Sequence, residues 1–475
     1  MIHFYTDKTI PAGVLIEQSI GQLSSVTDES PQVRHLVIQF VHTQYYLPDH
    51  PPLELLALLS IRLEADASVV IEGSVFLTAP EWVTQLQGIP DESSSNRDSL
   101  EQFCHRHSLP WLRLSDPWML APIHIPKPWG QEIWYTGIEA RGQAGVMAGV
   151  GSIPLPWLLD LMSAQIGLPE RAAPILLKVL DPLADEIYGD LYFELHQEKQ
   201  EVYVVTNVDK DAWPEGVGAI QLGFAAHVRQ SYESNDEFKQ AYLSSVKAYK
   251  QVRCLVDSLL DQKKIAEGVE LIQPASRSQL KKWISELSQH HQNRELLNNE
   301  CKLRQAMNSF VADHPLRVGD VVTVPKLVPH ALQHGVRVVE FQTPVYERKI
   351  LSFGQKVLTQ SHWDTQEALE LANLDFAQLE SPELISATPA LQIERIVDFD
   401  DFEVLRVQLD GSYVFQAETY SVLMVLQGQL HLSLAQQNNI GTGQAVLLPV
   451  SEKSWQVSSS APCLFLLASP KYLAK

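Results

Sequence analysis

The sequence has few cysteines, and none of them is placed to form a recognisable framework. The 475 residues include four, which are widely separated and form no CxxC pair: Cys104, Cys254, Cys301 and Cys463. Disulfide scaffolds and zinc ribbons need cysteines at close, regular spacings. Both classes are therefore excluded, and we expect a reduced, cytoplasmic setting for this chain.

Basic residues are also scarce. Lys and Arg number 36 against 57 Asp and Glu, which gives a formal net charge of −21. Phosphate backbones and anionic lipid surfaces attract clustered cations, so we expect neither a nucleic-acid nor a membrane partner. No apolar run approaches the ~20 residues of a membrane-spanning helix. The first residues lack the basic start and apolar core of a signal peptide. One small basic pocket for a phosphorylated metabolite is compatible with this balance.

Hydrophobic periodicity predicts strands along most of the chain and helices in one block. Residues 229–313 carry Phe238, Tyr242 and Val246 at the spacing of one helix face, whereas the flanking segments show short apolar runs typical of strands. The length allows roughly two to four domains. We therefore predict a mainly β fold with a helical insertion. The run Leu53–Leu63 fits a buried helix or a strand, and its period does not decide between them.

The stretch from Gly189 to Thr206 carries the first candidate ligands. One residue separates Glu194 from His196, so on a strand their side chains point to the same face. We interpret residues 197–200 as the turn of a β-hairpin whose return strand brings Glu201 beside them. Carboxylate and imidazole ligands together suit zinc, manganese or iron(II). The alternative is an exposed hairpin with ordinary surface Glu and His side chains.

A second stretch supplies a fourth candidate ligand. Gly319 precedes a β run that ends at Pro325, and His330 follows five residues later. Together the two stretches match the two cupin motifs, a ligand pair followed by a Glu and then G-x5-P-x-G-x2-H. Leu327 stands where the second motif often has its second glycine, and Glu194 where the first often has a histidine. The spacing is otherwise kept, which predicts a metal-binding cupin.

The last hundred residues repeat part of this pattern. Gly443 to Pro449 has the same G-x5-P spacing, but hydrophobic residues fill the first motif and no histidine follows the proline. We therefore predict a second, diverged cupin without metal ligands.

Taken together, these segments resemble the class I mannose-6-phosphate isomerases. The resemblance rests on Lys127–Gly130 (KPWG), Asp190–Val204, Pro329–His330 and Val339–Gln342 (VEFQ). It implies a double-stranded β-helix (cupin, jelly-roll) bi-domain, to which the N-terminal residues add an α+β accessory domain. The expected domain ranges are 1–110, 111–228, 229–313, 314–375 and 376–475.

The resemblance also implies an activity and a site. The family interconverts mannose 6-phosphate and fructose 6-phosphate, moving a proton between C1 and C2 through an enediol. The metal, zinc with manganese or iron possible, would be held by Glu194, His196, Glu201 and His330. The catalytic candidates are Arg348, Glu340 and Lys199. Lys199 and Lys127 would be candidates for sugar or phosphate contacts, and Trp129 would form a wall of the pocket or serve in packing.

The position of Glu340 on its strand supports a role inside the barrel. It shares a face with Val336 and Val338, and a carboxylate there is costly unless it is used or paired. We therefore assign it to substrate positioning or acid–base work. The alternative is a salt bridge to Arg348 or Lys356.

One departure from the family keeps other functions open. Glu194 stands where the family has a neutral glutamine, and a second carboxylate would lower the Lewis acidity of the metal. The alternatives are a cupin that binds a sugar phosphate without turnover and an iron-dependent cupin oxidoreductase. The pairs Lys199-x-Glu201 and Glu340-x-Gln342 favour the isomerase over the oxidoreductase. In each case we expect a small-molecule partner and leave the oligomeric state open.

Overall fold

The computed structural model describes residues 2–25, 32–64, 68–89, 96–149, 151–169, 172–375, 381–416, 419–433, 439–450 and 454–471. Strands predominate, which confirms the predicted mainly β class. Within these residues, no helix is both long and apolar enough to cross a membrane. Contacts divide the chain into two compact units. The first comprises Met1–Ile123, Trp134–Leu177 and Pro382–Lys475, and the second comprises His124–Ile133 and Lys178–Ser381.

The first unit begins with a five-stranded sheet in the order β1-β2-β3-β4-β5. Its strands are β1 (Ile2–Tyr5), β2 (Gln32–His42), β3 (Leu53–Leu63), β4 (Val69–Leu77) and β5 (Leu112–Arg113). The run Leu53–Leu63, whose sequence fits either a helix or a strand, is therefore strand β3. It pairs with β2 on one edge and β4 on the other, and Leu55 to Leu59 are fully buried. A central strand covered on both faces has such a continuous apolar sequence, without alternation.

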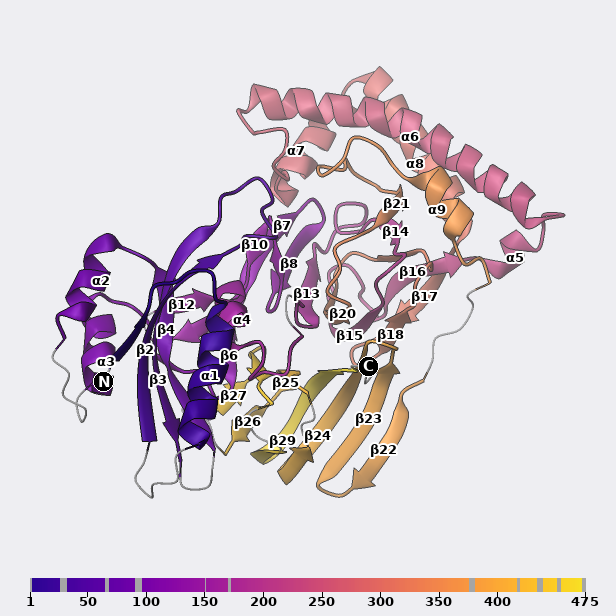
Figure 1. The fold of residues 1–475 in the computed structure, drawn as a ribbon. Coiled ribbons are helices and arrows are strands. Elements are labelled where there is room, and N and C mark those ends of the chain that lie inside the picture. The colour runs from indigo at the N-terminus through magenta and orange to yellow at the C-terminus, as the bar shows by residue number, and fades with distance from the viewer. Residues whose placement is uncertain are drawn as a thin grey trace. The chain divides into compact units, whose positions relative to one another are not determined.

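Helices flank this sheet (Figure 1). They are α1 (Ala12–Ser24), α2 (Pro80–Gln87), α3 (Asn96–Arg106) and α4 (Leu155–Met162). Helix α1 packs on β2 and β3, while Leu86 of α2 and Phe103 of α3 join a core with Leu58 and Phe76 of the sheet. Helix α4 lies where the sequence predicts a helix from Leu155.

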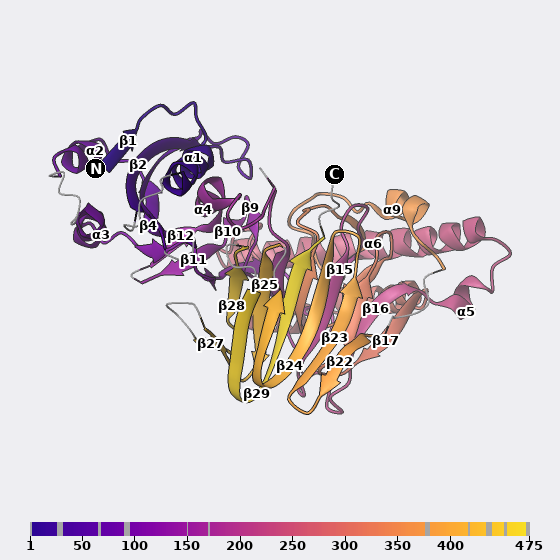
Figure 2. The same cartoon turned by 60° about the horizontal axis from the view of Figure 1, so that its bottom comes forward.

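The C-terminal strands of the first unit form one large sheet, seen side by side in Figure 2. Its path is β12-β11-β6-β28-β25-β29-β24-β23-β22, with β26 and β27 beside β29. The bounds are β6 (Trp118–Ala121), β11 (Gly145–Ala148), β12 (Gly151–Pro154), β22 (Glu383–Thr388), β23 (Leu391–Asp398), β24 (Phe402–Gln416), β25 (Ser421–Gln427), β26 (Gln429–Leu432), β27 (Asn439–Gly441), β28 (Ala445–Leu448) and β29 (Ser454–Pro470). A two-stranded pair, β9 (Ile138–Glu139) and β10 (Gly142–Gln143), completes this unit.

The second unit contains two sheets. The six-stranded sheet follows the order β18 (Val321–Val324), β15 (Glu201–Val208), β20 (Val336–Gln342), β13 (Leu176–Pro182), β8 (Gly130–Trp134) and β7 (Ile123–Lys127). The five-stranded sheet follows the order β17 (Val311–Leu316), β16 (Gly218–Phe224), β19 (His330–Leu332), β14 (Phe193–Leu195) and β21 (Lys349–Ser352).

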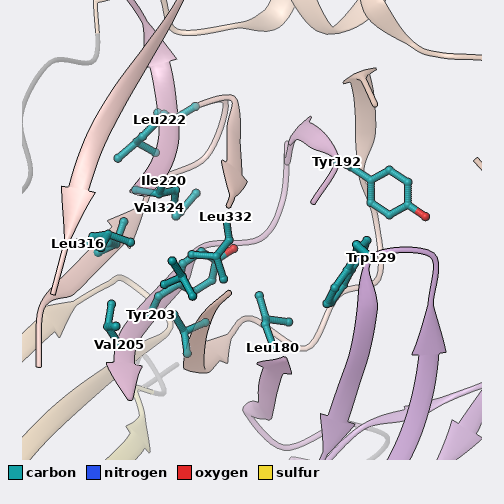
Figure 3. Close-up of a cluster of buried hydrophobic side chains, with 14 of the residues drawn as sticks. Trp129, Leu180, Tyr192, Tyr203, Val205, Ile220, Leu222, Leu316, Val324 and Leu332 are labelled. Atoms are coloured by element: carbon teal, nitrogen blue, oxygen red, sulfur yellow. The ribbon is translucent and has the colours of Figure 1, made fainter. Parts of the chain in front are cut away.

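The two sheets share one apolar core, shown in Figure 3. Tyr203 and Val205 from β15 gather there with Ile220 and Leu222 from β16 and with Leu332 from β19. Side chains that alternate along a strand point to opposite faces of its sheet, so one face of each sheet supplies this core. The site described below lies among these inward-facing positions.

Helices cover the other face of the five-stranded sheet (Figure 1). Phe193 and Leu195 of β14 pack there with Phe238 and Tyr242 of α6. The helices are α5 (Ala226–Arg229), α6 (Asn235–Ala266), α7 (Arg277–Ser288), α8 (His291–Asn308) and α9 (Thr365–Leu371). The side chain of Ser276 forms a capping box with Gln279 at the start of α7.

The hairpin predicted at residues 189–206 is wrong in its pairing. Strand β14 pairs with β19 and β21, whereas β15 pairs with β18 and β20 in the other sheet. After His196 the chain passes from the five-stranded sheet to the six-stranded sheet. Side chains along the strand alternate between its two faces in this arrangement just as they would in a hairpin. The prediction of which side chains share a face is nevertheless correct, because Phe193 and Leu195 join the outer helical core while Tyr192 joins the inner one.

Gly189, which lies just before β14, is closely packed against atoms of two other segments. A Cβ at Gly189 would lie 1.9 Å from the carbonyl oxygen of Leu183 and 2.7 Å from Cβ of His334. We predict that Gly189→Ala lowers the free energy of unfolding by about 2 kcal/mol or more, because backbone atoms must move.

The exposed Gly21 of α1 offers a contrast, because no atom lies within 4 Å of a Cβ placed there. Gly21→Ala should therefore raise stability by about 0.5–1 kcal/mol. Denaturant unfolding followed by circular dichroism checks both, and an unchanged midpoint for Gly189→Ala would contradict the first.

Candidate functional site

Three predicted ligands converge although they come from different strands. His196 follows β14, Glu201 begins β15 and His330 begins β19. All three side chains are buried, and one ligand atom from each lies within 4.8 Å of those of the other two. Among the residues that the structure describes, this is the group of His, Cys, Asp and Glu suited to a metal ion.

The contacts of His330 direct one of its ring nitrogens at Glu201. Its Nδ1 lies 3.1 Å from the carbonyl oxygen of Val328, which can only accept a hydrogen bond, so Nδ1 carries a proton. The other nitrogen, Nε2, lies 3.2 Å from Oε2 of Glu201. Either a proton on Nε2 or a metal ion can bridge two atoms at this distance. Zinc sites commonly fix their histidines in this way, with the second nitrogen donating to a carbonyl.

His196 is held in the form that binds metals. Its burial, and next the nearby Lys199, lower the pKa of the imidazole well below its ordinary value, so the ring is neutral. Within the part of the chain that the structure describes, neither ring nitrogen makes a hydrogen bond, although Nε2 lies 3.4 Å from Oε1 of Glu201. A buried nitrogen without a partner is costly, and a metal ion would satisfy it. The residues present therefore fit a divalent metal.

Glu201 is the carboxylate of this group and is ionised. Burial opposes its charge, but the nearby Lys199 holds the pKa well below its usual range. Nζ of Lys199 lies 2.8 Å from Oε1, and the hydroxyl of Tyr203 donates to Oε2 at 2.5 Å. The lysine that sequence analysis assigned to catalysis thus contacts the ligand carboxylate directly.

Glu194 lies beside the group of three, directly opposite His330 in the β14–β19 pair. One carboxylate oxygen is 3.8 Å from Nε2 of His196, and the other is 3.6 Å from Nη1 of Arg348. Arg348 also donates to Thr359 at 2.7 Å and lies over the ring of Tyr192 at 4.6 Å. Glu194 therefore stands between the candidate metal position and the predicted catalytic arginine.

Glu340 is fully buried and points inward, as its shared face with Val336 and Val338 predicts. Its partner is neither of the two cations proposed from the sequence. Nζ of Lys178, on β13, lies 3.2 Å from Oε1 of Glu340. Burial, and next the nearby charge of Glu201, raise the pKa of Glu340 well above its ordinary value.

Sequence analysis missed Lys178. It interrupts the apolar run Leu176–Leu180, and a lysine in the middle of an apolar strand is the signal that could have identified it, since such a residue is seldom buried without a partner.

These side chains line a pocket with an empty volume of about 360 Å³. Trp129 and Leu180 form apolar parts of its wall, and Glu132 and Arg348 form polar parts. Each carboxylate here lies against one cation: Glu132 against Lys127 at 2.9 Å, Glu340 against Lys178 at 3.2 Å, Glu201 against Lys199 at 2.8 Å and Glu194 against Arg348 at 3.6 Å. The predicted lysine and tryptophan of the KPWG segment therefore both reach this region.

Leu327 adopts the backbone conformation that the cupin motif usually gives to glycine. Its φ is +66°, in the left-handed region that costs a leucine about 1 kcal/mol. Its N–H donates to the carbonyl oxygen of His196 at 2.7 Å, and its own carbonyl accepts from Asn373 at 2.8 Å. The leucine therefore performs the turn expected of glycine and connects the two segments that carry the histidines.

Comparisons with solved structures give the same fold. A mannose 6-phosphate isomerase from Bacillus subtilis matches with a TM-score of 0.51 at 14% identity, over 74% of this chain and 99% of that one. A point mutant of phosphomannose isomerase from Salmonella typhimurium matches with a TM-score of 0.51 at 12% identity, over 75% and 100% of the two chains. A zinc-bound mannose 6-phosphate isomerase matches with a TM-score of 0.50 at 12% identity, over 75% and 100%.

No known family profile and no curated protein sequence matches the chain. The structural matches lie at identities that show the fold alone. The resemblance proposed from the motifs is confirmed at this level: the chain has the fold of the phosphomannose isomerases.

Proposed function

We propose that this protein is a metal-dependent aldose–ketose isomerase that interconverts mannose 6-phosphate and fructose 6-phosphate. The observation that carries the proposal is the convergence of the buried His196, Glu201 and His330, whose ligand atoms lie within 4.8 Å of one another at a charged pocket. The fold of the phosphomannose isomerases supports the same reaction class. The four positions that correspond to the family's metal ligands are all occupied in this chain by residues that can bind a metal.

His196, Glu201 and His330 would hold the metal, and Glu194 would be the fourth ligand. Bound there, a divalent ion supplies a Lewis acid that polarises the carbonyl and hydroxyl oxygens at C1 and C2 of the open sugar. Two imidazoles with carboxylates are a ligand set for zinc, and also for manganese or iron.

The charges of the pocket support a phosphorylated substrate. Four carboxylates and four cations cancel formally, so an added divalent ion leaves two positive charges. A sugar phosphate dianion supplies two negative charges. Water is largely excluded from these buried positions, so an unbalanced charge would be costly and a matched one favourable.

Glu340 is our candidate for moving the proton between C1 and C2. A base in this role must be ionised and yet take up a proton readily, which the raised pKa of Glu340 favours. Lys178 lies against the same carboxylate and would hold it in position. Arg348, fixed by Thr359 and Glu194, would place positive charge beside the developing enediolate.

The second carboxylate, Glu194, is compatible with this chemistry because it is paired. Its contact with Arg348 withdraws negative charge from the ligand atom. The same holds for Glu201, which Lys199 contacts. A metal held by two such carboxylates keeps more Lewis acidity than one held by two unpaired carboxylates.

The first test is turnover after removal and return of the metal. We expect chelated protein to be inactive on mannose 6-phosphate, and zinc, manganese or iron(II) to restore fructose 6-phosphate formation in a coupled assay. His330→Ala should remain inactive with every metal, because one imidazole ligand is gone. His362→Ala is the matched control, since that side chain is 69% exposed. A folded, metal-loaded wild type without turnover would refute the assignment and point to a binding role or another sugar phosphate.

The second test concerns the proton-transfer group. We predict that Glu340→Gln lowers kcat by about 10²–10⁴-fold, the usual contribution of a general base, while the bound metal stays stoichiometric. The raised pKa means that the wild-type base is lost as the pH falls through a value above the ordinary carboxyl value of about 4.3, so kcat should fall in that window. Glu367→Gln, at an exposed pair with Lys349, is the control and should change neither. A Glu340→Gln enzyme within tenfold of wild type would exclude this role.

A further inference from the structure

We propose that Tyr203 is a positioning residue of the metal centre, whose hydroxyl fixes the Glu201 carboxylate so that each of its oxygens turns one lone pair toward an imidazole. The inference rests on the proposed metal site and deepens it. The motifs assign no role to Tyr203, and the structure points to one for its hydroxyl.

The contacts of Glu201 separate into an outer and an inner set. Oε2 accepts from the Tyr203 hydroxyl at 2.5 Å and faces Nε2 of His330 at 3.2 Å. Oε1 contacts Nζ of Lys199 at 2.8 Å and faces Nε2 of His196 at 3.4 Å. A carboxylate oxygen offers two lone-pair directions. On each oxygen, the outer donor takes one direction, and the other remains for the histidine side, where a metal would bind.

Strand geometry places the tyrosine donor on the side of the carboxylate. Glu201 begins β15 and Tyr203 follows two residues later, so their side chains lie on the same side of the strand. Lys199 precedes the strand and contacts the other carboxylate oxygen. A carboxylate held by a donor on each oxygen cannot rotate without losing one of them.

The tyrosine ring is itself immobilised. Tyr203 is 3% exposed and packs in the core between the two sheets, where Figure 3 shows it near Val205 and Leu332. Its hydroxyl donates to Oε2 of Glu201 at 2.5 Å. A rigid ring with such a donor holds an acceptor more precisely than a flexible lysine does.

A purely structural role makes a different prediction. The ring contributes to the core, and phenylalanine would keep that packing. If the hydroxyl only stabilises the fold, its loss lowers stability and leaves metal affinity unchanged. If it positions the ligand, its loss weakens metal binding, since removal of groups that hold metal ligands typically costs 10–100-fold in affinity.

The chain offers a matched control in Tyr249 of α6. Its hydroxyl also donates to a buried carboxylate, that of Glu300 at 2.9 Å, and its ring is also fully buried. Glu300 lies on α8 and is outside the metal group. Tyr203→Phe and Tyr249→Phe thus remove the same kind of hydrogen bond, one at the ligand and one in the helical layer.

The experiment is zinc titration of chelated full-length protein against a competing chromophoric chelator, with thermal unfolding of each apo variant. We expect Tyr203→Phe to weaken zinc binding about 10–100-fold and Tyr249→Phe to bind within twofold of wild type. His330→Ala marks the affinity of a site that lacks a ligand. Both phenylalanine variants should unfold cooperatively, which shows that the comparison concerns folded protein.

Two results would overturn the inference, and only one of them would also refute the proposed function. Wild-type zinc affinity in Tyr203→Phe shows that the hydroxyl is structural and leaves the proposed isomerase untouched. A wild type that binds neither zinc, manganese nor iron(II) removes the metal centre and with it the proposed function. Because binding is read directly, absence of turnover on mannose 6-phosphate does not affect the outcome.

Discussion

The buried carboxylate of Glu201 is the charge on which the centre depends. It is 2% exposed, and an isolated carboxylate at such a position would be protonated, because transfer of its charge from water is costly. Here a lysine, a tyrosine hydroxyl and two imidazoles surround it. The arrangement keeps the carboxylate ionised and directs one of its oxygens toward each imidazole. A buried group of two histidines and one carboxylate is suited to a divalent metal ion.

The same principle extends across the pocket. Its carboxylates lie against cations from several strands, so that local charge is balanced although the chain as a whole carries −21. Breaking one partner of a buried pair leaves the other unpaired, at a cost of about 3–5 kcal/mol. The pocket therefore resists gradual loss of single charged groups. Among the described residues, the core of the large C-terminal sheet around Val407, Val425 and Phe465 is instead built from apolar side chains.

The sequence predicted the orientation of side chains on β14 better than the strand pairing. Spacing sufficed for Glu194 and His196, because alternation along a strand holds in any sheet, and the outward packing of Phe193 and Leu195 agrees with it. Pairing depends on contacts between distant segments, so the hairpin was wrong although its side chains were correctly oriented. The partner of Glu340 is a similar case. Lys178 lies far from Glu340 in sequence, on a strand whose neighbouring residues are apolar. No local sequence feature links the two side chains.

The domain ranges expected from the sequence stay a prediction. The strand pairings show why domain boundaries are hard to predict from the order of residues along the chain. Strand β6 (Trp118–Ala121) pairs with β28 (Ala445–Leu448), which lies more than three hundred residues later. Neither strand carries a turn signal or a motif that refers to the other. Segments of this kind are joined by backbone hydrogen bonds and apolar packing, which many sequences can provide, whereas ligand spacing is restricted by chemistry.

Leu327 shows how far local sequence rules can be broken at such a site. A leucine with a φ of +66° is strained, and the motif would have glycine there. The strain is tolerated because the side chain packs against the helical layer and both backbone groups are bonded, one of them to His196. That bond joins the end of the first ligand segment to the loop that precedes His330. Glycine would relieve the strain but remove the packing and leave the loop freer before folding, so the position of His330 relative to His196 would be less well determined. The departure from the motif is therefore consistent with a fixed distance between the two histidines.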